Sequence, residues 1–142
     1  MSEANKNVLR RFYLEVIGQG RVELIEELFA REYVERAHSG NAVLSFEWLK
    51  ATSLAFRNRV VVMEGLYAEG DLVRCRWSAK LTQTGEFMGV SPAGQTIELS
   101  GVGIFRLRDG KIAERWDYDY SDGLKLKLES PMPSRVREAI AV

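Results

Sequence analysis

Apolar residues in the first third of the chain recur at helical spacing, which predicts three helices. Ser2 can cap a helix that runs to about Ile17, where a glycine-containing segment ends the pattern. A short second helix is expected over Arg21 to Ala30. Ser45 is placed to cap a third helix, which ends at Arg57-Asn58. We therefore expect the N-terminal part of the protein to be mainly helical.

From Val60 onward the apolar period changes towards two, which predicts long antiparallel strands. The expected strands are Val60 to Ala68, Leu72 to Leu81, Thr96 to Arg108 and Ile112 to Tyr120. Asp109-Gly110 joins the last two, and Asp-Gly between strand-forming runs is a strong signal for a type I′ hairpin. The segment Thr82 to Gln95 is rich in glycine, so we expect a loop or bulged crossing at the rim of a pocket.

Helices followed by one curved sheet predict an α+β architecture in which the helices cover the concave face. Such an arrangement leaves a cone-shaped cavity between the helices and the sheet. A length of 142 residues fits one domain, 1–142, with a core over about 7–128. Residues 129–142 are expected to form a C-terminal tail or a short helix.

The charge balance narrows the class of ligand. Twenty basic and twenty acidic residues cancel, so we expect neither nucleic acid nor a membrane surface as partner, but a hydrophobic small molecule. The chain has no long apolar run, and a cytoplasmic location is expected. One cysteine, Cys75, and one histidine, His38, cannot form a disulfide or a usual zinc site, so we expect no metal. Cys75 is predicted to be buried and His38 to lie in a loop outside the mechanism.

Two candidate acid/base residues lie on the returning strand of the hairpin. They are Asp117 and Asp119, which alternate with aromatic residues. Aromatic surroundings raise the pKa of a carboxylate and suit it to proton transfer near neutrality. Strict alternation, however, puts Asp117 on the face opposite Trp116 and Tyr118, where it could be a solvated surface residue. A bulge in this strand would turn Asp117 towards the cavity, and Asp119 is the reserve candidate.

The segments TGEFMGVSPAGQ (84–95) and FRLRDGKIAERWDYD (105–119) resemble the two signatures of SnoaL-like polyketide and ester cyclases, within the nuclear-transport-factor-two-like superfamily. The resemblance extends from about Asn7 to Leu128. It implies a cone-shaped α+β barrel with three N-terminal helices on a curved, mainly antiparallel sheet. One fold serves many chemistries, so the resemblance specifies the architecture more closely than the reaction.

The resemblance also implies a reaction. In the aldol cyclases of this family, a carboxylate on the last strand acts as general acid/base on an anthraquinone-type ketoester, without a cofactor, and the matching position here is Asp117. Three positions where relatives carry histidine hold Arg36, Gln83 and Gly103 instead. We therefore expect aldol-type cyclisation in polyketide or related secondary metabolism. The alternatives are a hydroxylase or epoxide-hydrolase type of enzyme, and a non-catalytic module that binds a small molecule or dimerises.

Further residues are expected to line the pocket or to fill the core. Arg36 and Gln83 could act as hydrogen-bond donors, although Arg36 could equally pair with a carboxylate. Gly103 would allow the close approach of another group, such as a flat ligand. The expected aromatic and thioether wall consists of Tyr13, Trp48, Trp77, Met88 and Tyr118. A homodimer is expected through the sheet face that carries Trp116, Tyr118, Tyr120, Val102 and Ile104.

Overall fold

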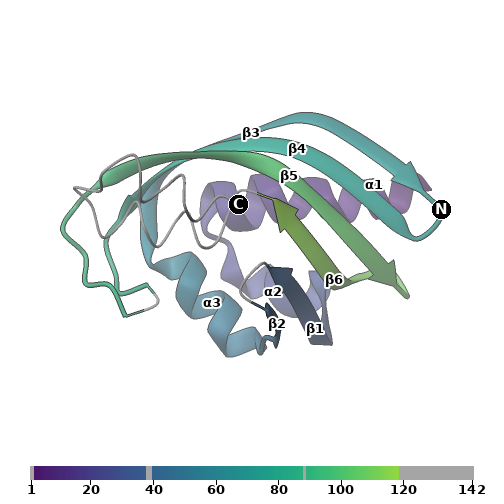
Figure 1. The fold of residues 1–142 in the computed structure, drawn as a ribbon, viewed down its shortest axis with the longest axis horizontal. Coiled ribbons are helices and arrows are strands. Elements are labelled where there is room, and N and C mark those ends of the chain that lie inside the picture. The colour runs from purple at the N-terminus through teal and green to yellow at the C-terminus, as the bar shows by residue number, and fades with distance from the viewer. Residues whose placement is uncertain (1, 38–39, 88, 119–142) are drawn as a thin grey trace.

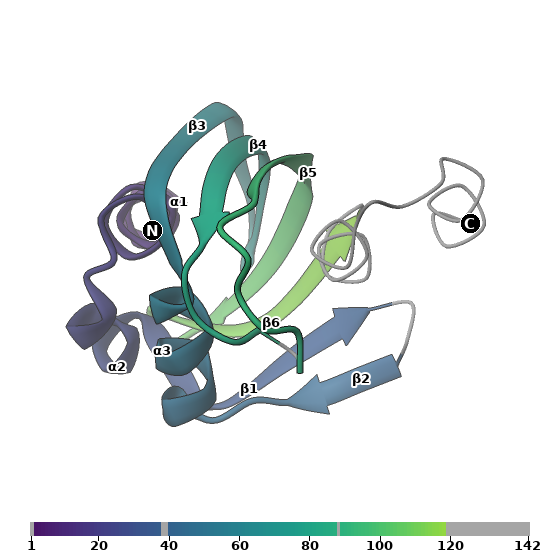
Figure 2. The ribbon, with the colours of Figure 1, turned by 90° about the vertical axis from the view of Figure 1, so that its left-hand side faces the viewer.

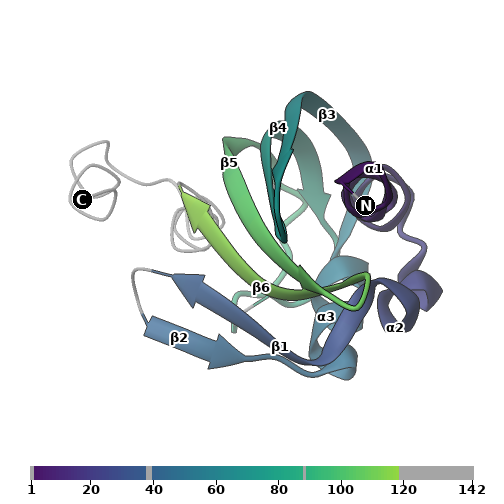
Figure 3. The same cartoon turned by 90° about the vertical axis from the view of Figure 1, so that its right-hand side faces the viewer.

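The computed structural model describes residues 2–37, 40–87 and 89–118, which form one curled sheet with helices on one side (Figures 1–3). The elements in chain order are α1 (Ser2–Arg11), π-helix η1 (Phe12–Ile17), 3-10 helix η2 (Val22–Leu24), α2 (Ile25–Leu28), β1 (Phe29–Ala37), β2 (Gly40–Val43), α3 (Phe46–Leu54), β3 (Phe56–Glu69), β4 (Leu72–Gln83), β5 (Thr96–Arg108) and β6 (Lys111–Tyr118). The expected α+β class is confirmed, but two strands, β1 and β2, come before the third helix.

The sheet has the strand order β2-β1-β6-β5-β4-β3. Neighbouring strands pair antiparallel except β1 and β6, which run parallel. The predicted hairpin between β5 and β6 is present, and Asp109 and Gly110 both have positive φ, 54° and 76°, as a type I′ turn requires. The turn between β3 and β4 likewise has Gly70 at a φ of 60°. The chain thus reverses direction at two turns that the local sequence predicts.

The core lies between the inner face of the sheet and the helices. Along β4 every second residue is buried, and these residues are Val73, Cys75, Trp77, Ala79, Leu81 and Gln83. Helix α1 and η1 supply Leu9, Phe12, Tyr13 and Val16 from the other side. Burying each large apolar side chain stabilises the fold by about 1.5–3 kcal/mol, so this layer holds α1 on the sheet.

Two local expectations are corrected by tertiary pairing. The second helix ends at Leu28 rather than Ala30, because Phe29 pairs with Ile112 and opens β1. Strand β2 was not expected from its loop-like composition, and it exists because it pairs antiparallel with β1. A two-stranded extension of the sheet therefore replaces part of the predicted loop, while His38 itself lies outside the described residues.

Helix α3 begins as predicted, since the Ser45 hydroxyl oxygen accepts a hydrogen bond from the Trp48 backbone N–H at 3.1 Å. It ends at Leu54, earlier than expected, and no described residue of this helix is buried. Trp48 is 39% exposed, and its place in a pocket wall stays a prediction. None of the helices in the described segments has both the length and the hydropathy needed to cross a membrane.

Candidate functional site

Buried polar side chains gather on the inner face of the sheet, in the middle of an otherwise apolar core. They are Tyr13 from η1, Tyr33 from β1, Trp77 from β4 and Arg115 from β6, and we call them, with Glu35, the inner-face cluster. The hydroxyl oxygens of both tyrosines and the indole nitrogen of Trp77 are fully shielded from solvent. Polar groups held in such surroundings interact more strongly than they do in water. This cluster is our candidate site.

The π-helix positions Tyr13 within this cluster. Phe12 and Tyr13 are consecutive, and both are buried against the sheet. The ring of Tyr13 packs edge-on against Phe105, with centroids 5.9 Å apart, and tilts against Trp77 at 6.2 Å. Short π-helical segments are rare and often occur at functional sites. The sequence periodicity predicted an ordinary helix here, and the π-helical turn is visible only in the structure.

Gly103 lies opposite Tyr13 on β5. A Cβ atom at this position would lie 2.8 Å from the Tyr13 hydroxyl oxygen and 2.7 Å from Cε1 of Phe105. Both distances are shorter than side chains tolerate, so only glycine fits. The close approach that a strand glycine indicates is therefore confirmed, and side chains of this protein make it. The flat ligand expected in that space is not needed to explain the glycine.

The backbone register places position 117 beside Gly103. Asp117 pairs with Gly103, which pairs in turn with Cys75 on β4. The predicted bulge is present, because Glu114 pairs with Arg106 and Ile112 with Leu107, leaving Ala113 as the additional residue. The side chains of Asp117 and Tyr118, and all of Asp119 and Met88, lie outside the described residues.

Arg115 brings a positive charge to the inner face. Its guanidinium lies over the rings of Phe105 and Phe12, 5.3 and 5.6 Å from their centroids. Its Nη1 is 3.7 Å from Oε1 of Glu35, and the Arg115 side chain is only 6% exposed. Arginine stays charged even when buried. Arg115 was not among the residues predicted for the site.

Gln83 is separated from this cluster by the length of β4. It lies eight residues beyond Cys75, about 26 Å along an extended strand. Its side-chain amide donates to the carbonyl oxygens of Gly85 and Val90, both at 2.8 Å. The Gln83 amide, which was expected to donate to a ligand, therefore binds the backbone of the loop after β4. The structure does not bring Gln83 next to Gly103.

Arg36 adopts the alternative expected for it, an ion pair. Its Nε donates to Oε2 of Glu114 at 2.8 Å, and Arg106 approaches the other carboxylate oxygen at 3.3 Å. The hydrogen bond from Arg36 is the main cause that lowers the pKa of Glu114 below its ordinary value. Arg36 and Arg106 also lie over the ring of Trp116, at 5.7 and 5.5 Å. Because successive residues of a strand alternate, this group lies on the outer face, opposite Arg115.

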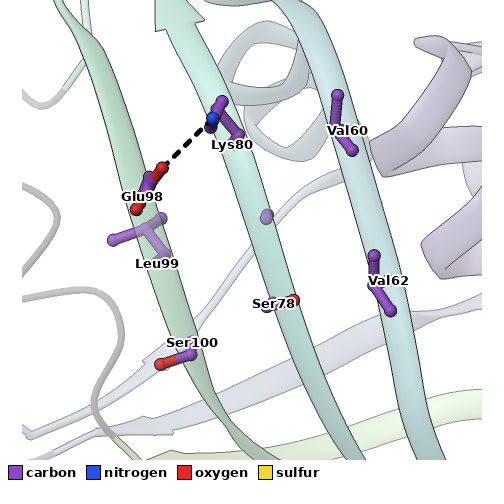
Figure 4. Close-up of a pocket in the computed structure, with 8 residues that line it drawn as sticks. Val60, Val62, Ser78, Lys80, Glu98, Leu99 and Ser100 are labelled. Atoms are coloured by element: carbon purple, nitrogen blue, oxygen red, sulfur yellow. Dashed lines mark ion pairs between the residues drawn. The ribbon is translucent and has the colours of Figure 1, made fainter.

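The outer face also carries a groove of about 530 Å³ over β3, β4 and β5 (Figure 4). Its floor and walls include Val60, Val62, Ser78 and Ser100, and an ion pair between Lys80 and Glu98, 3.1 Å apart, crosses one part of it. Of the expected site residues that the structure describes, none lines this groove. It is a surface feature separate from the inner-face cluster.

The comparisons with known proteins agree on one family. Residues 7–127 match the family model described as SnoaL-like polyketide cyclase. A SnoaL-like polyketide cyclase, provisionally so assigned, from Jannaschia sp. CCS1 is 26% identical, with 92% of this chain and 95% of that chain covered and a TM-score of 0.73. AclR of Streptomyces galilaeus, provisionally assigned as a hydroxylase, is 25% identical, with coverages of 99% and 92% and a TM-score of 0.72. IdmH of Streptomyces antibioticus, provisionally assigned as a polyketide cyclase, is 28% identical, with coverages of 80% and 89% and a TM-score of 0.59. Among curated protein sequences nothing matches the chain.

Proposed function

Because the chain belongs to the SnoaL-like polyketide cyclase family, we propose that it catalyses an aldol-type ring closure of a hydrophobic polyketide-like molecule, with Asp117 as the general acid/base. The observation that carries this proposal is the backbone pairing of Asp117 with Gly103. Gly103 lies directly beside the Tyr13 hydroxyl, and Arg115 is two residues before Asp117 on the same strand. A carboxylate at this position would have both a hydrogen-bond donor and a positive charge nearby. Those are the features that keep a base ionised in an apolar site.

The chemistry follows from proton transfers alone. The carboxylate of Asp117 takes the proton from the carbon between two carbonyl groups, leaving an enolate. The enolate carbon attacks a carbonyl carbon of the same molecule, a carbon–carbon bond forms, and the carbonyl oxygen takes the electron pair. Protonated Asp117 then returns its proton to this alkoxide, which restores the base. A conjugated polycyclic substrate delocalises the enolate, so the protein supplies proton transfer and geometry, without a cofactor.

Arg115 and Trp77 have supporting roles in this proposal. The charge of Arg115 favours the anionic enolate and the ionised form of the base, since opposite charges stabilise each other strongly where water is excluded. The buried ring of Trp77, which packs against Tyr13, would form a wall against the flat substrate.

The test is the substitution Asp117→Asn, assayed with a panel of anthraquinone-type ketoesters by following the cyclised product. The amide keeps the shape of the side chain but cannot accept the proton, so we expect turnover to fall about 100- to 10,000-fold. Asp119→Asn is the matched control and should retain most of the activity. More than a tenth of the wild-type rate in Asp117→Asn would show that another residue is the base.

A second candidate function is hydrolysis of the epoxide-hydrolase type, in which Asp117 takes a proton from water while the water oxygen bonds to an epoxide carbon and the ring C–O bond breaks. The hydroxylase alternative would also need an oxidant such as dioxygen. It is favoured by the similarity to AclR over 99% of this chain and by glycine at position 103. The same assay separates the candidates by product mass, because intramolecular ring closure leaves the mass of the substrate unchanged, hydrolysis adds one water and hydroxylation adds one oxygen. Tight binding without any product would instead identify a small-molecule-binding module.

A further inference from the structure

The guanidinium of Arg59 binds carbonyl groups at the ends of two helices. At the end of η1, its Nη1 donates to the carbonyl oxygens of Val16 and Ile17, at 3.1 and 3.0 Å. At the end of α3, its Nη2 donates to the carbonyl oxygen of Ser53. The carbonyl oxygen of Phe56, where β3 begins, accepts from Nε and Nη2 at 3.0 and 2.7 Å. Because the C-terminus of a helix carries partial negative charge, a cation stabilises both helix ends.

These contacts differ from those of an ordinary surface arginine. Among the described residues, all hydrogen-bond partners of Arg59 are uncharged oxygens, and they include the hydroxyl of Ser53 at 3.2 Å. Burial lowers the pKa of Arg59 below its ordinary value, although an arginine stays charged at any ordinary pH. Withdrawing this charge from water has a cost, which hydrogen bonds to the helix ends offset. The side chain therefore depends on the exact placement of both helices.

A bulge in β3 turns Arg59 towards the helices. The register of β3 against β4 shifts between Arg57 and Val60, which leaves one additional residue in β3. Asn58, inside this bulge, has a φ of 52°, a left-handed value that asparagine tolerates better than most residues. Bulges often redirect a side chain next to a functional site. Here the bulge directs a guanidinium to the end of η1.

The chain after η1 is shaped around the same guanidinium. In a continuing helix the next amides would bind the last carbonyl groups, but Arg21 N–H donates to Glu15 and Val22 N–H to Gly20, at 3.1 and 2.8 Å. Gly20 has a φ of 74°, and a Cβ atom there would lie 3.5 Å from Cζ of Arg59. A π-helix, a bulge and a left-handed glycine thus meet at one side chain. Such irregular backbone persists where its surroundings hold it.

From this convergence we propose that Arg59 is a positioning residue, which holds η1 in its π-helical form and thereby holds Tyr13 in the inner-face cluster. A π-helical turn contains more residues than the α-helical turn that would replace it. If η1 relaxed by one residue, the helix before it would rotate by about 100° relative to the chain after it, the angle between successive residues of an α-helix. The ring of Tyr13 would then leave Gly103 and Trp77.

The proposal deepens the proposed function and rests on it only for the part that the inner-face cluster takes in the reaction. The placement of Tyr13 can be measured without a substrate. Its ring lies 6.2 Å from that of Trp77, so the indole N–H signal of Trp77 in a ¹⁵N–¹H spectrum depends on where the Tyr13 ring lies. The chain has three tryptophans, and loss of the other two signals in Trp48→Phe and Trp116→Phe identifies the third.

The experiment compares this signal in the wild-type protein, Arg59→Lys, Arg59→Met and Arg57→Met. In Arg59→Lys we expect the Trp77 signal to leave its wild-type position, because one ammonium group cannot reach all the oxygens that the planar guanidinium binds. Arg59→Met removes every donor and should move the signal further. Arg57 is exposed on the same strand, so Arg57→Met is the matched control and should leave the signal in place. Arg59→Lys keeps the charge and covers the case in which Arg59→Met does not fold.

A Trp77 signal that stays at its wild-type position in Arg59→Lys would overturn the proposal. If the variant is also less stable, the role of Arg59 is merely structural, and the proposal is wrong in that case as well. In the ketoester assay we expect kcat of Arg59→Lys to fall about 10- to 100-fold, since small displacements of a site reduce turnover strongly. Arg57→Met should keep the wild-type kcat.

The two proposals fail separately. If the Trp77 signal moves in Arg59→Lys while Asp117→Asn is fully active, Arg59 positions Tyr13 and the proposed reaction is wrong. If the signal does not move while Asp117→Asn abolishes turnover, the proposed function stands and the positioning role of Arg59 is wrong.

Discussion

The two faces of the same sheet carry similar residues in different surroundings. On the inner face Arg115 pairs with Glu35 and lies over two phenylalanine rings, and its side chain is 6% exposed. On the outer face Arg36 pairs with Glu114 and lies over Trp116, but its side chain is 35% exposed. The residue types are nearly the same, and the access of water differs. A buried charge depends on its partner far more than a solvated one, so the two pairs should differ in energy and in use.

The largest expected difference concerns the arginines themselves. Arg115→Met leaves Glu35 without its ion-pair partner in a largely buried place and should reduce the free energy of unfolding by about 3 kcal/mol. Arg36→Met should cost less than about 1 kcal/mol, because water reaches this pair and Glu114 keeps Arg106. Urea unfolding of both variants measures this difference. Equal losses would mean that the two faces do not differ in the way proposed here.

A smaller effect is expected from adding one methyl group to each face. In Gly103→Ala the new atom meets two fully buried rings, Phe105 and Tyr13, so overpacking should cost about 2 kcal/mol. In Gly65→Ala the nearest group is the exposed ring of Tyr67 at 3.1 Å, which can move. That variant should change stability by less than about 0.5 kcal/mol, since the reduced freedom of the unfolded chain offsets the contact. Thermal unfolding that ranks Gly65→Ala as the more damaging change would contradict this picture.

We propose that the outer face of the sheet forms a homodimer interface. A substitution there should have the smallest effect on the stability of the subunit itself. Val60 and Val62 are 58% and 48% exposed there, and Val102 and Ile104 lie on the same face of the sheet. Val62→Asp should leave the free energy of unfolding of the subunit within about 0.5 kcal/mol. Light scattering should give twice the chain mass of 16.1 kDa for the wild type and a shift towards the single mass for Val62→Asp. A wild-type mass of one chain at all micromolar concentrations would rule out the dimer.

The sequence by itself determined those features that depend on a few neighbouring residues. Asp109-Gly110 was sufficient to predict the β5–β6 hairpin, since glycine and aspartate tolerate the positive φ values found there. Ser45 was sufficient to predict the start of α3, because the cap acts within one turn. The period of two along β4 predicted its buried face, including Cys75 and Trp77. The need for a bulge in β6 could also be inferred, because strict alternation conflicted with the candidate base.

Only the tertiary structure decided which distant residues meet. The parallel pairing of β1 with β6 brings Arg36 to Glu114, 78 residues away, and Glu35 to Arg115. The register of β4, β5 and β6 separates Gln83 from the position of Asp117, although both had been assigned to one pocket. The contact between Tyr13 and Gly103 depends on how η1 packs across β5. Hydrophobic periodicity specifies which side of each element is buried but not which other element covers that side. For that reason Gly103 indicated a close approach without identifying Tyr13 as the residue that makes it.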